Sequence, residues 1–308
     1  MLNDSAIADW KKNGIYIRSS KAGGLKVFAQ EVGSPTASPD KTLLLLHGFP
    51  ESSFSYHLVV QGLRDRFERI LLFDLPGFGF SDKPREGYSY SLLEQADVAL
   101  EVWKHFGVRG GHLLAHDMGD SVLTELVARE VEQSLPNWLT AGFKSYTLTN
   151  GSVVLQFAQL RITQKLLLTH WGKYIARFIK PSVFRHQIKS AHGEAPLDEL
   201  EITRLWTLNT YNDGVNITHL TIKYLIDRQR YEEKRWLPAV SKTKVPVHIC
   251  WGDKDNVAKV VIAHYLKEQV CPDAKLTIME GLGHFCQLGA PESWLEAVLS
   301  YYTKQHFL

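Results

Sequence analysis

Residues 112–121 read His-Leu-Leu-Ala-His-Asp-Met-Gly-Asp-Ser and join a predicted strand to a predicted helix. The run from Val108 to Ala115 is apolar except at residues 109–112, which is typical of a short buried strand. Beyond the join, apolar side chains recur at helical spacing, at Val122, Leu123, Leu126 and Val127. The stretch therefore predicts a strand, a tight turn and a helix in immediate succession.

The turn itself has the pattern small-x-Asp-x-Gly, from Ala115 to Gly119, with Asp117 at its centre. This spacing is that of a nucleophile elbow, a strained turn on which small residues flank an exposed reactive side chain. The alternative is an ordinary aspartate that caps the following helix, since Asp is a favoured N-cap residue. Three further stretches, in a consistent order along the chain, favour the elbow.

Composition limits the classes of function. The chain has 308 residues with 44% hydrophobic and 22% charged side chains, enough for a substantial globular core. A net charge of +2 gives no electrostatic reason to expect a nucleic acid partner. The three cysteines, Cys250, Cys271 and Cys286, lack CxxC spacing, so we expect no cysteine-built metal site and no disulfide framework.

The N-terminal residues and the longest apolar runs bear on location. Residues 1–10 include Asp4 and Asp9 and lack a long apolar stretch, so no signal peptide is expected. No run of 18 apolar residues predicts a membrane span. We expect a cytoplasmic protein, a monomer or homodimer, that uses no cofactor and no metal.

Strands and helices alternate through most of the chain. Apolar runs predict strands at 15–17, 25–31, 42–46, 69–73, 108–115, 146–149, 245–251 and 275–280. Helical patterns of 10–15 residues separate several of them, which indicates a mostly parallel, doubly wound sheet. Residues 153–236 predict helices only and are rich in aromatic side chains. We therefore expect an α/β core formed by residues 1–152 and 237–308, with a helical cap at 153–236.

Four motifs fall at the carboxyl ends of predicted strands, where ligands bind in such sheets. Besides the Asp117 elbow, these are His47-Gly48-Phe49-Pro50, Gly252-Asp253-Lys254-Asp255 and Gly281-Leu282-Gly283-His284. The first can supply a backbone N–H to an oxyanion hole, with the N–H of Met118 as the second donor. The order nucleophile, acid, histidine is that of the α/β-hydrolase fold.

Between the two aspartates near 252, we choose Asp255 as the partner of His284, because it lies further into the loop beyond the strand. An Asp nucleophile suits attack on saturated carbon, which gives an alkyl ester that an activated water then hydrolyses. We expect a small apolar organic substrate with a leaving group on sp³ carbon, such as an epoxide or an alkyl halide. No serine occurs in a G-x-S-x-G context, which disfavours a serine esterase.

These motifs resemble the epoxide hydrolase and haloalkane dehalogenase group of the α/β-hydrolases, over about residues 25–303. Residues 116–120, Asn150-Gly151, 212–214 and 224–228 more closely resemble the mesoderm-specific transcript branch. The resemblance implies Asp117 as nucleophile and Asp255 and His284 as its partners. His-Gly-Phe-Pro-Glu at 47–51 favours epoxides, whereas dehalogenases usually have Asn in place of Phe49 and Trp in place of Met118.

Epoxide hydrolases protonate the departing oxygen with two cap tyrosines, and the resemblance assigns that role to Tyr224 and, without a motif, to Tyr174. Tyr224 could instead pack its ring on the core. Two alternatives from other classes stay open: a non-catalytic ligand-binding protein, and the cofactor-independent oxygen chemistry of the related coelenterazine luciferases. The non-catalytic alternative is disfavoured because the chain keeps all three of Asp117, Asp255 and His284.

Overall fold

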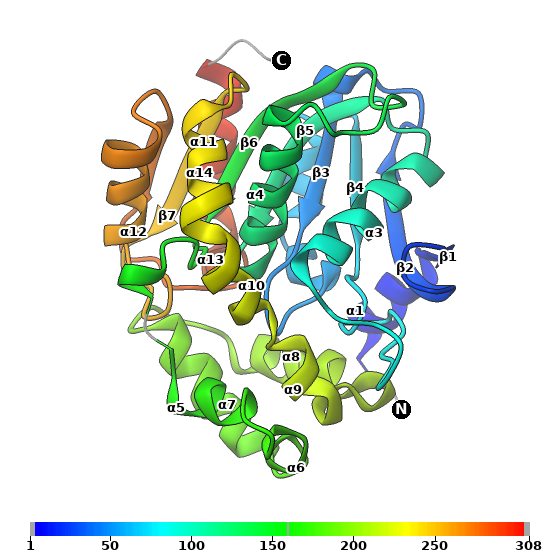
Figure 1. The fold of residues 1–308 in the computed structure, drawn as a ribbon, viewed down its shortest axis with the longest axis vertical. Coiled ribbons are helices and arrows are strands. Elements are labelled where there is room, and N and C mark those ends of the chain that lie inside the picture. The colour runs from blue at the N-terminus through cyan, green and yellow to red at the C-terminus, as the bar shows by residue number, and fades with distance from the viewer. Residues whose placement is uncertain (1–3, 159, 305–308) are drawn as a thin grey trace.

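The computed structural model describes residues 4–158 and 160–304 and contains one eight-stranded sheet (Figure 1). Its strands are β1 (Ile15–Ser19), β2 (Leu25–Gly33), β3 (Thr42–Leu46), β4 (Arg69–Phe73), β5 (Gly110–His116), β6 (Gly142–Thr149), β7 (Val247–Gly252) and β8 (Lys275–Met279). The order is β1-β2-β4-β3-β5-β6-β7-β8. β1 pairs antiparallel with β2, and β2 with β4, while the pairs from β4 to β8 are parallel. The predicted mostly parallel sheet is confirmed.

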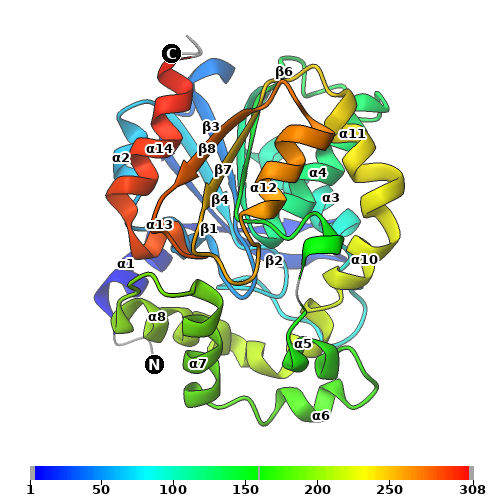
Figure 2. The same ribbon diagram turned by 90° about the vertical axis from the view of Figure 1, so that its left-hand side faces the viewer.

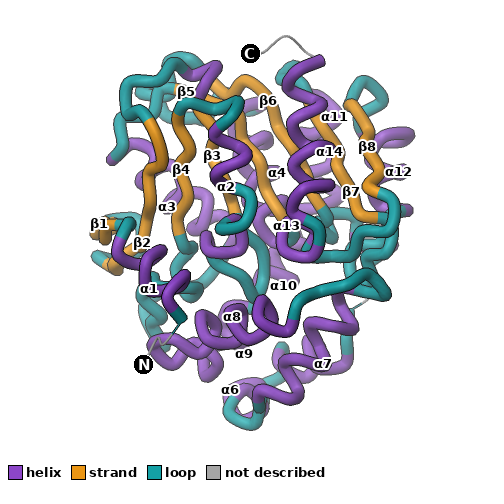
Figure 3. The backbone as a smooth tube through the Cα atoms, turned by 180° about the vertical axis from the view of Figure 1, so that it is seen from behind, coloured by secondary structure: helices purple, strands orange, loops and turns teal. Residues whose placement is uncertain are grey.

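Alternation along the central strands separates two cores. In β3, Leu44 and Leu46 pack on one face of the sheet, whereas Leu43 and Leu45 pack on the other. Helices α3 (Leu92–His105), α4 (Met118–Val131), α11 (Leu237–Lys242) and α12 (Val261–Tyr265) cover the first face. Helices α2 (Val60–Arg64) and α14 (Pro291–Lys304) cover the second (Figures 2 and 3). Because both faces are buried, the parallel strands read as continuous apolar runs.

The described part of residues 153–236 contains no strand, in agreement with the helical pattern of the sequence. Its helices are α5 (Ile162–Leu167), α6 (Gly172–Ala176), α7 (Pro181–His192), α8 (Glu199–Thr210), α9 (Thr218–Thr221) and α10 (Tyr224–Tyr231). α5 to α9 lie beyond the edge of the sheet, and α10 leads back from them to the start of α4, where Arg228 contacts Ser121 (Figure 1). We call α5 to α9 the roof; the limits of a cap domain remain a prediction.

Short helical turns complete the chain. The 3₁₀ helices are η1 (Pro39–Lys41), η2 (Ser53–Tyr56), η3 (Leu155–Phe157) and η4 (Tyr211–Ile217), and the π-helical turns are η5 (Glu232–Trp236) and η6 (Leu266–Val270). Between β3 and β4 the helical structure is limited to η2 and α2. α13 (Cys286–Gly289) follows the last strand loop.

The helix α1 (Ser5–Lys12) has no counterpart in the sequence prediction. The Asp4 side chain caps it by accepting the Ile7 N–H at 3.1 Å. Only Ile7 and Trp10 are buried within it, and the Trp10 indole N–H donates to Ser53 Oγ at 3.2 Å. Two buried positions in eight are too few for a visible helical period, so contacts with the rest of the chain determine this helix.

Candidate active site

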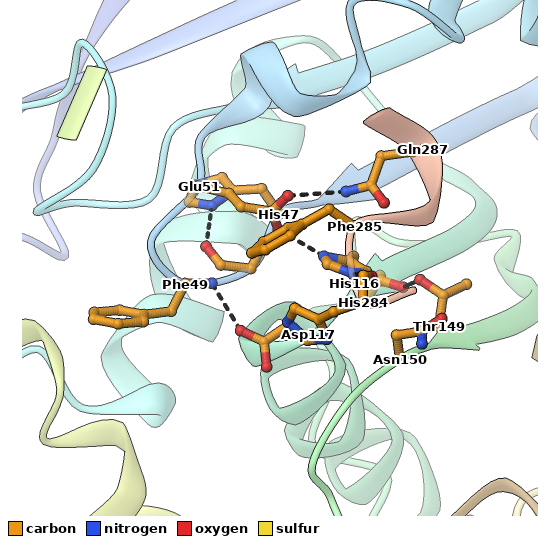
Figure 4. A network of polar contacts seen from close by, with 12 residues as sticks. His47, Phe49, Glu51, His116, Asp117, Thr149, Asn150, His284, Phe285 and Gln287 are labelled. Atoms are coloured by element: carbon orange, nitrogen blue, oxygen red, sulfur yellow. Dashed lines mark hydrogen bonds and ion pairs between the residues drawn. The ribbon is translucent and has the colours of Figure 1, made fainter. Parts of the chain in front are cut away.

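Polar side chains gather at the carboxyl edge of the parallel strands. Asp117 follows β5, Asn150 follows β6, Asp255 lies three residues beyond β7, and His284 lies in the loop after β8. Parallel strands bring their carboxyl ends to the same edge of a sheet, so residues far apart in sequence meet there. Figure 4 shows Asp117, Asn150 and His284 at this edge, together with the loop that carries Phe49.

The Asp117 backbone is strained, with φ 48° and ψ −109°. A positive φ is uncommon for any residue with a side chain and is held only where neighbouring structure requires it. The Asp117 N–H donates to the Thr149 carbonyl at 3.1 Å. A Cβ at Gly119 would lie 2.7 Å from the Leu46 carbonyl oxygen, so only glycine lets the start of α4 approach the sheet this closely. This geometry explains the small-x-Asp-x-Gly pattern.

The Asp117 carboxylate faces the loop that follows β3. Its Oδ2 accepts the Phe49 N–H at 2.9 Å. A Cβ at Gly48 would lie 2.7 Å from the Asp117 Cβ, so the loop also needs glycine at that position. The predicted second donor, the Met118 N–H, belongs to the first residue of α4, where a helix leaves its N–H groups without intrahelical partners.

A buried arginine lies beside the elbow. Arg228 of α10 donates from Nε to Ser121 Oγ at 2.7 Å and from Nη2 to the Asp117 carbonyl at 3.2 Å. The same Nη2 is 3.9 Å from Asp117 Oδ1, and the guanidinium stacks 4.6 Å from the Tyr224 ring centroid. Arg228 was not among the residues expected in the site; its positive charge compensates the negative charge of Asp117.

Asp255 and His284 contact each other. The His284 Nδ1–H donates to Asp255 Oδ2 at 2.7 Å, which leaves His284 Nε2 as the hydrogen-bond acceptor of the ring. Asn150 Nδ2 donates to the same oxygen at 2.8 Å, and the N–H groups of Val257 and Ala258 donate to Oδ1 at 2.6 and 2.9 Å. The orientation of this carboxylate is therefore set by four donors.

The other candidate acid has a different partner. Asp253 Oδ1 accepts the Gly281 N–H at 2.7 Å, and its side chain is 26% exposed. Asp253 thus supports the loop after β8, while Asp255 contacts the imidazole. Asn150, to which the sequence analysis assigned no role, acts as a bridge, because its Oδ1 accepts the Gly252 N–H at 3.1 Å while its amide nitrogen donates to Asp255.

Behind the elbow lies a buried pair, Glu51 and His116, which Figure 4 shows between the two loops. His116 Nδ1 is 2.6 Å from Glu51 Oε2, and His116 Nε2 donates to the His284 carbonyl at 2.9 Å. Glu51 also accepts the Gly48 N–H at 3.1 Å and the Gln287 amide at 2.9 Å. The pair therefore joins the Phe49 loop, the elbow and the His284 loop.

Charge stabilises this pair. Burial lowers the pKa of His116, but the Glu51 carboxylate outweighs burial and raises the pKa of His116 to about 9. Burial raises the pKa of Glu51, while His116 acts in the opposite direction and leaves the pKa below its ordinary value. At neutral pH both groups are charged. No spacing rule in the sequence pointed to them, since 65 residues separate the two.

His47 supports the Phe49 loop from behind. Its Nε2 accepts the Leu75 N–H at 3.0 Å, so the ring proton lies on Nδ1, which donates to the Gly48 carbonyl at 2.8 Å. Burial lowers the pKa of His47, so the ring is neutral. His47 was predicted among the oxyanion and substrate-binding residues, and the structure instead places it beneath the loop.

A cavity lies between the sheet edge and the roof. Its floor includes Phe49, Pro50, Asp117, His284 and Tyr224. Tyr224 is buried, and its ring lies 5.7 Å from that of Phe49. Burial raises the pKa of Tyr224, so its hydroxyl stays protonated and can donate.

Tyr174, predicted to donate a proton together with Tyr224, does not lie at the site. It lies on α6 with a side chain 45% exposed, near Trp171 and Lys173, and it does not line the cavity. α6 is only five residues long, and its buried residues are Gly172 and Ala176, so the tyrosine falls on its outer side. Tyr174 is therefore not positioned to protonate a group bound above Asp117.

Within the described part of the chain, no group of three or more His, Cys, Asp or Glu side chains is arranged to hold a metal ion. None of the helices there combines the length and the apolar character needed to cross a membrane.

Comparison with known proteins assigns the family. Residues 41–291 match the alpha/beta hydrolase fold family. The chain belongs to the α/β-hydrolase fold family. It is 37% identical over 300 residues to "Putative hydrolase LipZ" of Mycobacterium tuberculosis, covering 97% of this chain and 99% of that one. It is 30% identical to the mouse mesoderm-specific transcript protein over 302 residues, covering 96% of this chain and 88% of the relative.

Solved structures of the family share the architecture. The epoxide hydrolase CorEH has a TM-score of 0.70 and 17% identity, with 95% of this chain and 99% of that chain covered. At this identity the likeness shows the α/β-hydrolase fold alone, since one fold supports many reactions. The reaction of this α/β-hydrolase therefore depends on the residues of its own site.

Proposed function

We propose that this α/β-hydrolase opens epoxides through a covalent ester on Asp117. One observation carries the proposal: the carboxylate of Asp117 stands on a strained elbow in the same cavity as His284, and the Phe49 N–H holds one of its oxygens at 2.9 Å. A carboxylate is already ionised at neutral pH and needs no base to attack saturated carbon.

In the first step, Asp117 Oδ1, the oxygen that Phe49 does not hold, attacks an epoxide carbon. The new C–O bond forms as the ring C–O bond breaks, and the ring oxygen takes a proton from the Tyr224 hydroxyl. Two properties of Tyr224 support this role: it lines the cavity, and its raised pKa keeps its hydroxyl protonated. The product of the step is a hydroxyalkyl ester of Asp117.

In the second step, His284 Nε2 takes a proton from water, and the oxygen of that water adds to the ester carbonyl. Asp255, fixed by four donors, orients the imidazole and stabilises its charged form. The oxyanion that develops on Asp117 Oδ2 is held by the N–H groups of Phe49 and Met118. The tetrahedral intermediate then expels the alkoxide, which takes the proton from His284 and leaves as the diol. The carboxylic acid left on Asp117 returns a proton to the Tyr224 oxygen, so Asp117, His284 and Tyr224 all regain their starting states.

Dehalogenation has weaker support from the same cavity. A departing halide needs N–H donors, and the side chains of Phe49 and Met118 have none. Phe49 packs against the rings of Phe78 and Tyr224, and Met118 is buried in the core. Epoxide opening instead needs a protonated acid above the nucleophile, which Tyr224 can supply.

The decisive test is to trap the ester. His284→Gln should still be alkylated by styrene oxide but should not release the diol, because water can no longer be activated. An intact mass should then rise by the mass of one substrate molecule. Asp117→Asn is the matched control and should show no increase. An unmodified His284→Gln mass, with wild type turning over the same epoxide, would exclude the covalent route.

A further inference from the structure

The cavity that contains Asp117 also holds a positive charge on its other side. Arg161, directly before α5, lines it together with Gln164 and Gln187 from the roof. Among the described residues that line the cavity, Asp117 is the sole Asp or Glu. The cavity thus has a carboxylate at its floor and a guanidinium at its roof.

Arg161 lacks a carboxylate partner within the described chain. Its Nη1 donates a hydrogen bond to the Gln187 carbonyl at 3.1 Å. Two other roof arginines are paired: Arg185 with Glu199, and Arg204 with Asp4 and Glu201. A guanidinium has five N–H donors, so most of those on Arg161 remain available to a bound molecule.

Burial makes this unpaired cation costly. Arg161 is partly buried, and burial lowers its pKa, while the negative charge of Asp255 opposes that change. A charged group taken out of water without an ionic partner raises the free energy of the folded chain. A bound anion would supply the missing partner, and a guanidinium fork fits a carboxylate through two parallel N–H···O bonds.

A second hollow suggests how such an anion reaches Arg161. This hollow is more open to solvent and shares Arg161 and Gln187 with the cavity. Its wall also includes His186, Asn256 and Lys259, and the described residues around it include no Asp or Glu. Arg161 therefore lies where the two hollows meet, on a route whose charged groups favour an anion.

The roof also lines the cavity with four apolar side chains, Leu167, Ile179, Phe184 and Ile188, beside the polar Thr163, Asn209 and Thr218. We propose that the substrate is an epoxide that carries a carboxylate, with its hydrocarbon against this wall and its carboxylate on Arg161. This inference rests on the proposed epoxide opening at Asp117. The sequence predicted a small apolar substrate, whereas the proposed substrate has an apolar part and one carboxylate.

The kinetic test compares a terminal epoxide of hexanoate with the same epoxide of hexanamide. Wild type should favour the carboxylate in kcat/KM by about tenfold or more, the usual range for a hydrogen bond between charged groups. Arg161→Gln should lose this preference through KM while turnover of the amide stays within about twofold, because the amide never used the charge. Arg161→Lys keeps the charge without the fork and should fall between them.

Arg177 offers a matched control, because it is exposed on the roof and does not line the cavity. Arg177→Gln should keep the wild-type preference for the carboxylate. An equal fall for both substrates in Arg161→Gln would show that Arg161 only supports the roof, and unchanged kinetics would show that it does not contact the substrate. Either result would overturn the proposal.

A binding measurement separates this inference from the proposed reaction. By calorimetry, wild type should bind hexanoate more tightly than hexanamide, and Arg161→Gln should bind the two alike. That result, with no epoxide opened by wild type, would reject the proposed reaction and retain the anion site. Conversely, a trapped ester on His284→Gln without a preference for hexanoate would retain the reaction and reject the role of Arg161.

Discussion

Two aspartates stand at the same edge of the sheet in very different surroundings. Asp255 accepts four hydrogen bonds, from Val257, Ala258, Asn150 and His284. Asp117 accepts one N–H on Oδ2 and has a guanidinium 3.9 Å from Oδ1. A carboxylate engaged by four donors can orient a base but has little freedom to attack, whereas one facing a cavity can. The different roles that we propose for the two aspartates therefore follow from the loops around them, since the residue type is the same.

The supports of the two aspartates also differ in charge. Three neutral amide groups donate to Asp255: the Asn150 side chain and the backbone N–H groups of Val257 and Ala258. None of these groups titrates, so their support does not depend on pH. The elbow of Asp117 is backed by the charged pair of Glu51 and His116. Variants of Asp117 and Asp255 should therefore affect different steps of the proposed reaction. Variants of the residues that support them, Glu51 and Asn150, should differ in how their effect on stability depends on pH.

The largest effect is expected at the elbow. Asp117→Asn keeps the size of the side chain but removes its nucleophilic oxygen, so turnover of styrene oxide should fall by at least about 10⁴-fold. The first step should fail, so rapid mixing should detect no ester. A variant that folds with the wild-type melting temperature and retains turnover would show that Asp117 is not the nucleophile.

Asp255→Ala should have the next largest effect, a fall of about 10³-fold to 10⁴-fold in turnover, because the imidazole loses its orienting partner. Unlike Asp117→Asn, this variant should still form the ester at a near wild-type rate and accumulate it. Asp253→Ala is the matched control, since Asp253 contacts the Gly281 N–H instead of the imidazole. Single-turnover measurements should find the Asp253 variant close to wild type; a reversal between the two would assign the acid to Asp253.

The sequence predicted the fold well because its signals are local. Buried parallel strands read as apolar runs, and each of the eight observed strands overlaps a predicted one. The elbow was visible because a strained aspartate and a close-packed glycine, Asp117 and Gly119, lie two residues apart. The contact between Asp255 and His284 was anticipated because loops after parallel strands meet at one edge.

The parts that the sequence did not predict depend on distant contacts. Glu51 and His116 are 65 residues apart, and Arg228 is 111 residues from Asp117, so no periodicity connects them. Tyr174 was misplaced because the sequence does not show which side of the short helix α6 faces the cavity. The charge of Arg161 is visible in the sequence, but its lack of a carboxylate partner is a property of the folded chain.

The smallest effect expected concerns the pair behind the elbow. Glu51→Gln removes the charge that raises the pKa of His116 to about 9 from the ordinary value of 6.5. A histidine whose pKa is raised on folding stabilises the fold fully below about pH 6.5, and this contribution disappears as the pH rises through about 9. Glu51, whose pKa is lowered on folding, contributes above its ordinary value of 4.5, and its contribution is lost as the pH falls through its folded pKa. Both contributions are therefore complete between these ranges, near pH 6.

Urea unfolding of wild type and Glu51→Gln at pH values from about 6 to 9 measures the contribution of the pair. The free energy of unfolding of wild type should fall by up to about 3 kcal/mol more than that of the variant across this range, because the native state of wild type holds a proton that the unfolded chain releases. The variant leaves His116 buried without a carboxylate, so its imidazole should be neutral throughout and its pH dependence correspondingly flatter. Asn150→Ala removes an uncharged support of Asp255. In the same experiment, it should lower the free energy of unfolding by the same amount at each pH. Equal pH slopes in wild type and Glu51→Gln would mean that His116 is already neutral in the native protein, and the contrast between a charged and an uncharged support would be wrong.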